Sequence, residues 1–219
     1  MLTLEQVKKD PEVINMLSLA EKHLDANGFT EHSIRHVSLV SKTASYILRT
    51  LEYSEEEIVL AEISGYLHDI GNAVNRMDHA HSGAILAYGI VKRLGMNYLE
   101  AGEIMLAIAN HDEHSGVPVS NISAAIILAD KSDVHRSRVR NKERSAFDIH
   151  DRVNYAVVES SIQINVEDCT AILNLHIDTE ICPVMDYFEI FLVRMTMTKK
   201  AASYLGLKFQ LIINDNRLL

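Results

Sequence analysis

The segment Gly65-Tyr-Leu-His-Asp-Ile-Gly71 decides how the rest of this chain is interpreted. It places His68 and Asp69 side by side at the end of an apolar run, with Gly71 two residues later. Neighbouring residues of a helix point about 100° apart, so both side chains can reach one point only where the helix ends and the backbone turns. Gly71 would permit that turn. The segment therefore predicts a helix end that holds a small ligand, and a metal ion suits this pair best.

Histidines gather in the same part of the chain, since seven of the eleven lie between residues 32 and 114. Histidine is the commonest metal ligand, and carboxylates complete such sites. His36 falls on the apolar side of a predicted helix, and Asp130 ends an apolar helical run, where a charge is costly unless it is paired or bound to a metal. We expect a metal site between the inward faces of several helices. The candidate ligands are His36, His68, Asp69, His81, His111 and Asp130, whereas His79 and His114 are expected beside the site or facing solvent.

The chain up to about residue 150 has a helical pattern. Asp10-Pro11, Thr30 and the capping box that begins at Ser54 are typical helix starts. Gly28 and Gly95 are typical helix ends. We predict a helical bundle over residues 1–150 that carries the metal site.

The pattern changes to strands after about residue 151. Polar and apolar residues alternate over residues 155–166 and 171–177, which predicts a β-hairpin. Pro183 begins a predicted long helix that ends near Leu205, and residues 208–213 predict a third strand. The predicted fold class is therefore mostly α, with a small C-terminal α+β appendage (β-β-α-β) over residues 151–219 packed on the helical domain.

The composition is that of a soluble globular protein, with 47% hydrophobic and 23% charged residues among 219. No apolar run is long enough to span a membrane, and the N-terminus lacks a secretion signal. Cys169 and Cys182 have no metal-type spacing and suit reduced thiols. The net charge of −9 argues against a nucleic-acid partner. We expect a cytoplasmic protein without a membrane partner.

His36, the pair His68-Asp69 and the distant Asp130 resemble the signature of the HD-domain superfamily of metal-dependent phosphohydrolases. The resemblance covers about residues 30–135. His81 and His111 look like the additional histidines of its dinuclear branches. The resemblance implies two ions that share Asp69: His36, His68 and Asp130 would complete one, and His81 and His111 would hold the other. His32 and Asn110 are candidates for an additional ligand or for a supporting role.

Two departures separate the chain from the HD-GYP branch, which hydrolyses cyclic dinucleotides. Asn72 stands where that branch has a lysine, and the loop Ser115-Gly-Val-Pro118 lacks the tyrosine of its Gly-Tyr-Pro motif. We therefore expect a dinuclear HD domain that is not a true HD-GYP domain.

The resemblance implies hydrolysis of a nucleotide or another phosphorylated small molecule by a metal-activated water, with Asp69 and His68 as catalytic residues. Mixed histidine and carboxylate ligands favour iron or manganese over calcium. Two alternatives remain open. An HD-type diiron oxygenase would use the same ligands, and a regulatory module could bind metal and nucleotide without turnover, which Asn72 in place of lysine keeps open.

A basic run follows Asp130 directly, with a net charge of +4 over residues 131–144. Arginine binds phosphate through paired hydrogen bonds, so this run could contact the substrate. Lys131 and Asp133 are expected nearest the site, and Arg136 and Arg140 are expected to share a helical face four residues apart. For most of the run a solvated surface is the simpler interpretation. The edge of the strand pair could also support a homodimer, although covering the helical domain is simpler.

Overall fold

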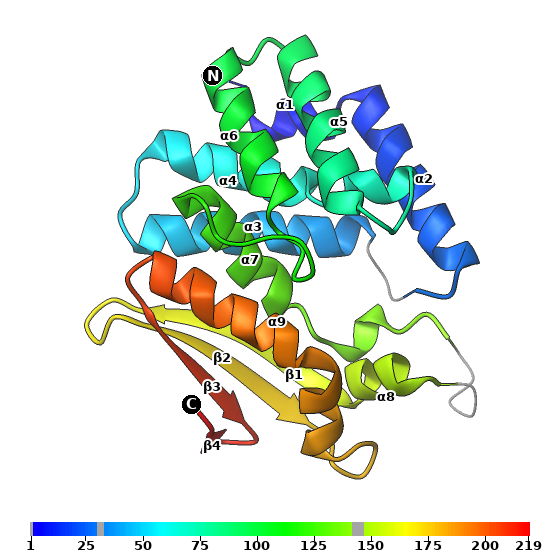
Figure 1. The fold of residues 1–219 in the computed structure, drawn as a ribbon, viewed down its shortest axis with the longest axis vertical. Helices are drawn as coiled ribbons and strands as arrows, with labels where there is room; N and C mark the ends of the chain where they lie inside the picture. The colour runs from blue at the N-terminus through cyan, green and yellow to red at the C-terminus, as the bar shows by residue number, and fades with distance from the viewer. Residues whose placement is uncertain (1, 30–32, 142–146) are drawn as a thin grey trace.

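The computed structural model describes residues 2–29, 33–141 and 147–219 and has the predicted mostly helical fold (Figure 1). The helices of the N-terminal part pack together in the upper half of the view, and a small sheet with one long helix forms most of the C-terminal part. In chain order the helical elements are α1 (Leu4–Lys8), α2 (Pro11–Ala26), α3 (Ile34–Thr50), α4 (Glu55–Leu67), η1 (Ile70–Ala73), α5 (His79–Arg93), α6 (Tyr98–Ala109), α7 (Asn121–Ser132), η2 (Arg136–Arg138), α8 (Ile149–Ala156) and α9 (Val184–Tyr204).

Side-chain caps define where these helices begin. Asp10 accepts hydrogen bonds from the first-turn amides of α2, and Ser54 forms a capping box with Glu57 at the start of α4. Ser33 caps α3, whereas Thr30, which the sequence suggested for this role, lies outside the described residues. The helix starts at Pro11 and after Ser54 were therefore predicted correctly.

The C-terminal sheet has the strand order β1-β2-β3-β4. β1 (Val157–Asn165) and β2 (Thr170–Ile177) form the predicted antiparallel hairpin, and α9 connects β2 to the parallel strand β3 (Lys208–Ile213). The short β4 (Asn216–Arg217) extends the predicted β-β-α-β order by one strand. The prediction that a strand begins at residue 155 was wrong, because Asp148 caps α8, which continues through Ala156.

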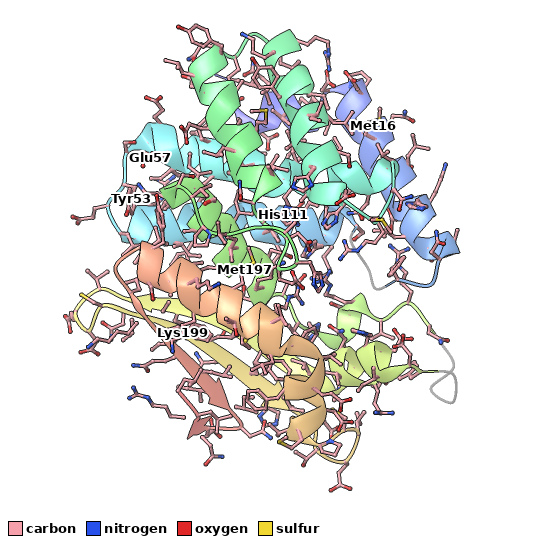
Figure 2. All side chains as sticks on the ribbon, in the orientation of Figure 1. Met16, Tyr53, Glu57, His111, Met197 and Lys199 are labelled. Carbon is pink, nitrogen blue, oxygen red and sulfur yellow. The ribbon has the colours of Figure 1, made fainter. Side chains whose placement is uncertain are left out.

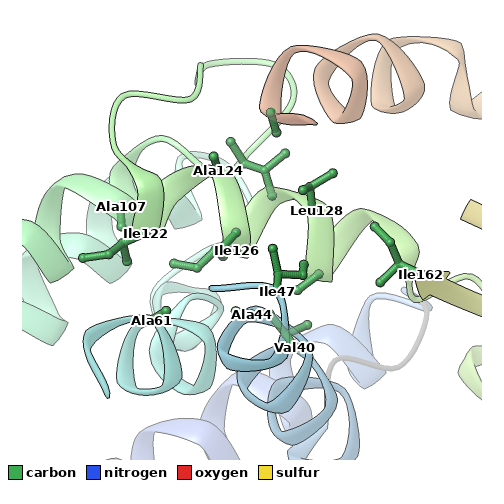
Figure 3. Close-up of a cluster of buried hydrophobic side chains, with 14 of the residues drawn as sticks. Val40, Ala44, Ile47, Ala61, Ala107, Ile122, Ala124, Ile126, Leu128 and Ile162 are labelled. Atoms are coloured by element: carbon green, nitrogen blue, oxygen red, sulfur yellow. The ribbon is translucent and has the colours of Figure 1, made fainter. Parts of the chain in front are cut away.

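α7 lies at the centre of the molecule. Every residue from Ile122 to Ser132 is buried, and Figure 3 shows its isoleucine and leucine side chains facing those of α3, with Ile162 of β1 alongside. One hydrophobic core includes residues of both the helices and the sheet. Among the described residues, no helix is long and apolar enough to span a membrane. The core therefore fixes α7, which carries Asp130, between the two parts of the chain.

Gly71 permits a close packing contact instead of a left-handed turn, since its φ is not positive. A Cβ atom at this position would lie 2.0 Å from the carbonyl oxygen of His79 and 2.5 Å from the amide nitrogen of Gly83. Real Cβ atoms never approach a backbone that closely, so only glycine lets α5 begin against η1. Gly71 thus sets the position of the first residue of α5.

We expect Gly71→Ala to displace the start of α5, because the added methyl group cannot share space with the backbone of His79. The melting temperature should fall, and the protein should bind fewer divalent ions. Gly89→Ala is the matched control on the same helix, since nothing lies within 4 Å of a Cβ there; it should be neutral or stabilise by about 0.5–1 kcal/mol. Thermal denaturation and elemental analysis of both variants measure these two effects. The same melting temperature and the same metal content in Gly71→Ala and Gly89→Ala would contradict the prediction.

Candidate metal centre

Six buried side chains meet inside the helical domain, near the labelled His111 in Figure 2. Each is at most 5% exposed. One lies on α3, two follow the last residue of α4, one is the first residue of α5, one is the second residue after α6, and one lies in the last turn of α7. The six are His36, His68, Asp69, His79, His111 and Asp130.

The Nδ1 atom of each of these histidines fixes the orientation of its ring. In His68, His79 and His111, Nδ1 lies 2.8, 3.1 and 2.7 Å from the carbonyl oxygen three residues earlier. In His36, Nδ1 lies 2.7 Å from Oδ2 of Asp133. Because these oxygens only accept, Nδ1 carries the proton, and Nε2 is directed into the site, as in metal-ligating histidines.

Asp69 lies between the four Nε2 atoms. Its Oδ2 is 3.6 Å from Nε2 of His36 and 3.3 Å from that of His68. Its Oδ1 is 3.5 Å from Nε2 of His79 and 4.0 Å from that of His111. Two ligand atoms that share one ion lie about 3 Å apart, since each is about 2.1 Å from the metal. Each oxygen of Asp69 therefore faces one pair of histidines. Its distances to their Nε2 atoms are close to the distance between two ligands of the same metal ion.

Asp130 completes the group beside His36 and His68. Its Oδ1 lies 3.3 Å from Nε2 of His36 and 3.9 Å from Nε2 of His68, and its Oδ2 lies 2.7 Å from Nζ of Lys131. Burial alone would raise the pKa of Asp130, but nearby positive charge, first of all the ammonium group of Lys131, outweighs burial and holds this pKa well below its ordinary value. Asp130 is therefore a carboxylate at neutral pH.

The electrostatics of the site favour an added cation. Burial lowers the pKa of His68, but Asp69 and Asp130 outweigh it and raise that pKa above its ordinary value. Burial lowers the pKa of His111 well below its ordinary value, and the other histidines lower it further. The Nε2 atoms of His79 and His111 lie only 3.2 Å apart. With Nδ1 protonated in both rings, two lone pairs face each other there, and a cation would stabilise them.

The donor atoms fit a divalent transition metal. Two groups of ligand atoms, each within 4.8 Å of one another, could hold an ion: His36 with His68 and Asp130, and His68 with Asp69 and His111. The buried Nε2 of His68 forms no hydrogen bond with any residue that the structure describes. Leaving such an atom without a partner costs about 1–3 kcal/mol, which a bound metal would offset. Imidazole and carboxylate donors suit iron, manganese and similar ions.

The structure brings His79 to this cluster and leaves His81 outside it. The His81 side chain is 53% exposed, and its Nδ1 lies 3.7 Å from Asp78 at the surface. On α5 the buried residues Gly83, Ala87 and Ile90 share the side of the helix on which His79 lies, and His81 lies on the opposite side. The structure therefore places His79, and not His81, in the cluster, because the packing of α5 on η1 decides which side of the helix faces inward.

Four further residues were expected in or near the site from the sequence. Asn110 does not reach the cluster, because its side-chain amide donates to the carbonyl of Leu106. His32 lies outside the described residues, and His114 is exposed as expected. Asp133 was expected near the site from its place in the basic run, and the structure shows its carboxylate against Nδ1 of His36, a contact that the sequence did not indicate.

The basic run makes protein contacts instead of forming one helical face. η2 ends at Arg138 and Val139 is extended, so Arg136 and Arg140 do not share a helical face, and that prediction was wrong. Lys131 pairs with Asp130 and Glu113. The guanidinium of Arg136 lies 5.2 Å from the ring centroid of Tyr155, and Arg140 pairs with Asp25 and Glu21.

A cleft of about 650 Å³ opens beside His79. Its lining includes Phe29, Arg76, Asp112 and His114. Nη1 of Arg76 lies 3.4 Å from Nε2 of His79, and both residues line the cleft. The cleft therefore lies against the His79 side of the cluster.

Comparison with known proteins finds a matching family and similar proteins. The model of the HD domain family matches residues 31–157. An uncharacterised protein of Methanocaldococcus jannaschii is 30% identical over 56% of each chain, so this chain spans about half the length of that relative. The crystal structure of a predicted HD superfamily hydrolase from an uncultured Thermotogales bacterium is 25% identical, with a TM-score of 0.46 over 62% of this chain and 75% of that one.

The family match spans more than half of the chain and includes the helices that carry His36, His68, Asp69 and Asp130. These residues, brought together in the fold, are the ones on which the sequence resemblance rested. The chain therefore belongs to the HD domain family.

Proposed function

We propose that this protein is a metal-dependent phosphohydrolase that acts on a nucleotide or another phosphorylated small molecule. The observation that supports this most directly is the division of the four imidazoles into two pairs, each facing one oxygen of Asp69. A carboxylate shared in this way is typical of two-metal hydrolytic sites. The free thiols of both cysteines suit the cytoplasmic location that belongs to the same proposal.

In this proposal two ions share Asp69, and His79 takes the place that the sequence suggested for His81. His36, His68 and Asp130 would hold one ion together with Oδ2 of Asp69. His79 and His111 would hold the other together with Oδ1. Iron and manganese are the metals that we favour, since both accept mixed imidazole and carboxylate ligands.

Bound ions would activate a water molecule and withdraw charge from the phosphoryl oxygens. The protein's own side chains keep the site anionic. Burial raises the pKa of Glu113, but Lys131 overcomes this effect and lowers it to about 2. Glu113 is therefore a carboxylate that holds Lys131 in place and not a proton donor. The cleft beside His79 has the volume of a typical small-molecule site and could receive the organic part of the substrate.

The proposal is tested with a panel of nucleotides and phosphomonoesters offered to manganese-loaded and iron-loaded protein. We expect phosphate release that chelator abolishes and that Asp69→Ala lacks. Activity that requires both ferrous iron and oxygen would instead indicate a diiron oxygenase. Thermal stabilisation by a nucleotide without any product would indicate a regulatory module. Either result would overturn the phosphohydrolase proposal.

The metal content of two variants tests whether His79 or His81 is a metal ligand. We expect His79→Ala to bind about one ion per chain instead of about two, because it removes a ligand that faces Oδ1 of Asp69. His81→Ala is a matched control two residues away on α5 and should keep the wild-type content, since its side chain is exposed. Elemental analysis after metal loading measures both. A loss in His81→Ala, with none in His79→Ala, would contradict our ligand assignment.

Asp133 should control the affinity of the His36 side of the centre. Its carboxylate accepts a hydrogen bond from Nδ1–H of His36. Mutation of such a partner of a ligating histidine typically lowers metal affinity by about 10–100-fold. We expect Asp133→Asn to weaken binding of one ion within this range while the protein stays folded. Asp25→Asn, which breaks an arginine pair at the surface, is the control. Metal titration of the apoprotein measures the affinity of each variant. Equal metal affinities of Asp133→Asn and the wild-type protein would refute this role of Asp133.

A further inference from the structure

The C-terminal appendage contributes one side chain to the metal centre. Arg194 belongs to α9, outside residues 31–157 that the family model matches. In the structure its side chain is only 12% exposed and lies against Asp130. α9 runs alongside α7 in Figure 1, which explains how a residue so late in the chain reaches this position.

The atom that Arg194 approaches is the oxygen of Asp130 that faces the histidines. Nη2 of Arg194 lies 3.7 Å from Oδ1 of Asp130, and that oxygen is also 3.3 Å from Nε2 of His36. A separation of 3.7 Å exceeds the usual length of a hydrogen bond, about 2.7–3.2 Å. The other oxygen, Oδ2, is already paired with Lys131. Arg194 therefore points toward the metal side of Asp130 without forming a close pair with it.

The guanidinium keeps donor capacity in a buried place. Its Nε is buried and has no hydrogen-bond partner among the residues that the structure describes. Its carbon lies 5.2 Å from the ring centroid of Phe191, which restrains the side chain from one side. A guanidinium has five N–H donors in a fixed plane that matches the oxygens of a phosphoryl group. A buried arginine with an unused donor is costly as a purely structural element.

The charge balance of the centre changes when metal is bound. Without metal, the carboxylates of Asp130 and Glu113 are paired with two cations, Lys131 and Arg194, and Asp69 adds a third negative charge among the histidines. Asp133 is paired separately with Arg35 and Arg138. One divalent ion makes this group net positive, and a second ion makes it more so. An oxyanion would then balance the excess positive charge beside Arg194.

We propose that Arg194 binds the phosphoryl oxygens of the substrate at the metal centre, so that the appendage completes the active site. This inference rests on the proposed phosphohydrolase function. It also gives the substrate phosphate a different partner from the residues of the basic run. Arg136 and Arg140 likewise have buried donors without partners among the described residues, but they lie against Tyr155 and against Asp25 and Glu21, and not against a residue of the cluster. Lys131 is already paired with both Asp130 and Glu113.

The test compares manganese-loaded wild type, Arg194→Gln, Arg194→Lys and Lys199→Gln. Lys199 is the matched control, since it is an exposed cation on the same helix (Figure 2). Binding of inorganic phosphate is measured by calorimetry, alongside metal content, melting temperature and the kinetics of the best substrate from the panel. We expect Arg194→Gln to weaken phosphate binding and raise KM by at least about tenfold at unchanged metal content, because it removes charge-assisted hydrogen bonds.

Arg194→Lys should recover part of the phosphate affinity, and Lys199→Gln should behave as wild type. Where Arg194→Gln fails to fold, Arg194→Lys carries the test, since it keeps the charge and loses the paired donors. Unchanged phosphate affinity in a folded Arg194 variant would overturn the proposal, as would loss of metal, which would make Arg194 a residue that positions Asp130. Phosphate binding that depends on Arg194, without hydrolysis of any substrate, would support Arg194 and refute the phosphohydrolase function separately.

Discussion

The Asp69 carboxylate, buried among four imidazole rings, is the constraint on which the rest of the helical domain depends. Its two oxygens lie within 4.0 Å of four Nε2 atoms, and each ring is held by its own Nδ1 contact. A buried negative charge and inward-facing imidazole nitrogens are costly together unless a cation joins them. The elevated pKa of His68 shows the same preference for positive charge. The packing that holds these groups together therefore produces a site that favours a metal ion.

The packing supports this arrangement in two ways. α7 is buried from Ile122 to Ser132, so Asp130 and Asp133 have little freedom to move. Gly71 allows α5 to begin directly against η1, which brings His79 to Asp69. Hydrophobic packing thus determines the positions of polar groups that could not hold themselves in place. The appendage belongs to the same system, because α9 packs on α7 and carries Arg194 to Asp130.

Sequence patterns predicted well those parts of the molecule that depend on local interactions. Asp10-Pro11 and Ser54 marked helix starts, because capping involves neighbouring residues only. The strand boundary near Tyr155 was wrong, since a short capped helix overrode the alternating pattern there. The choice between His79 and His81 failed for a related reason. Both lie near the start of one helix, and only its contact with η1 decides which of them faces inward.

By itself the sequence determined the helical class of the N-terminal part, the β-β-α-β order of the C-terminal part, and the residues His36, His68, Asp69, His111 and Asp130 that meet in the buried cluster. These features follow from periodicity, capping and a motif with a fixed local spacing. Only the tertiary structure decided that His79 joins the cluster, that Asp133 orients His36, and that Arg194 reaches Asp130. The last two contacts join residues about one hundred and about sixty positions apart, and such separations are set by how helices pack and not by any local pattern.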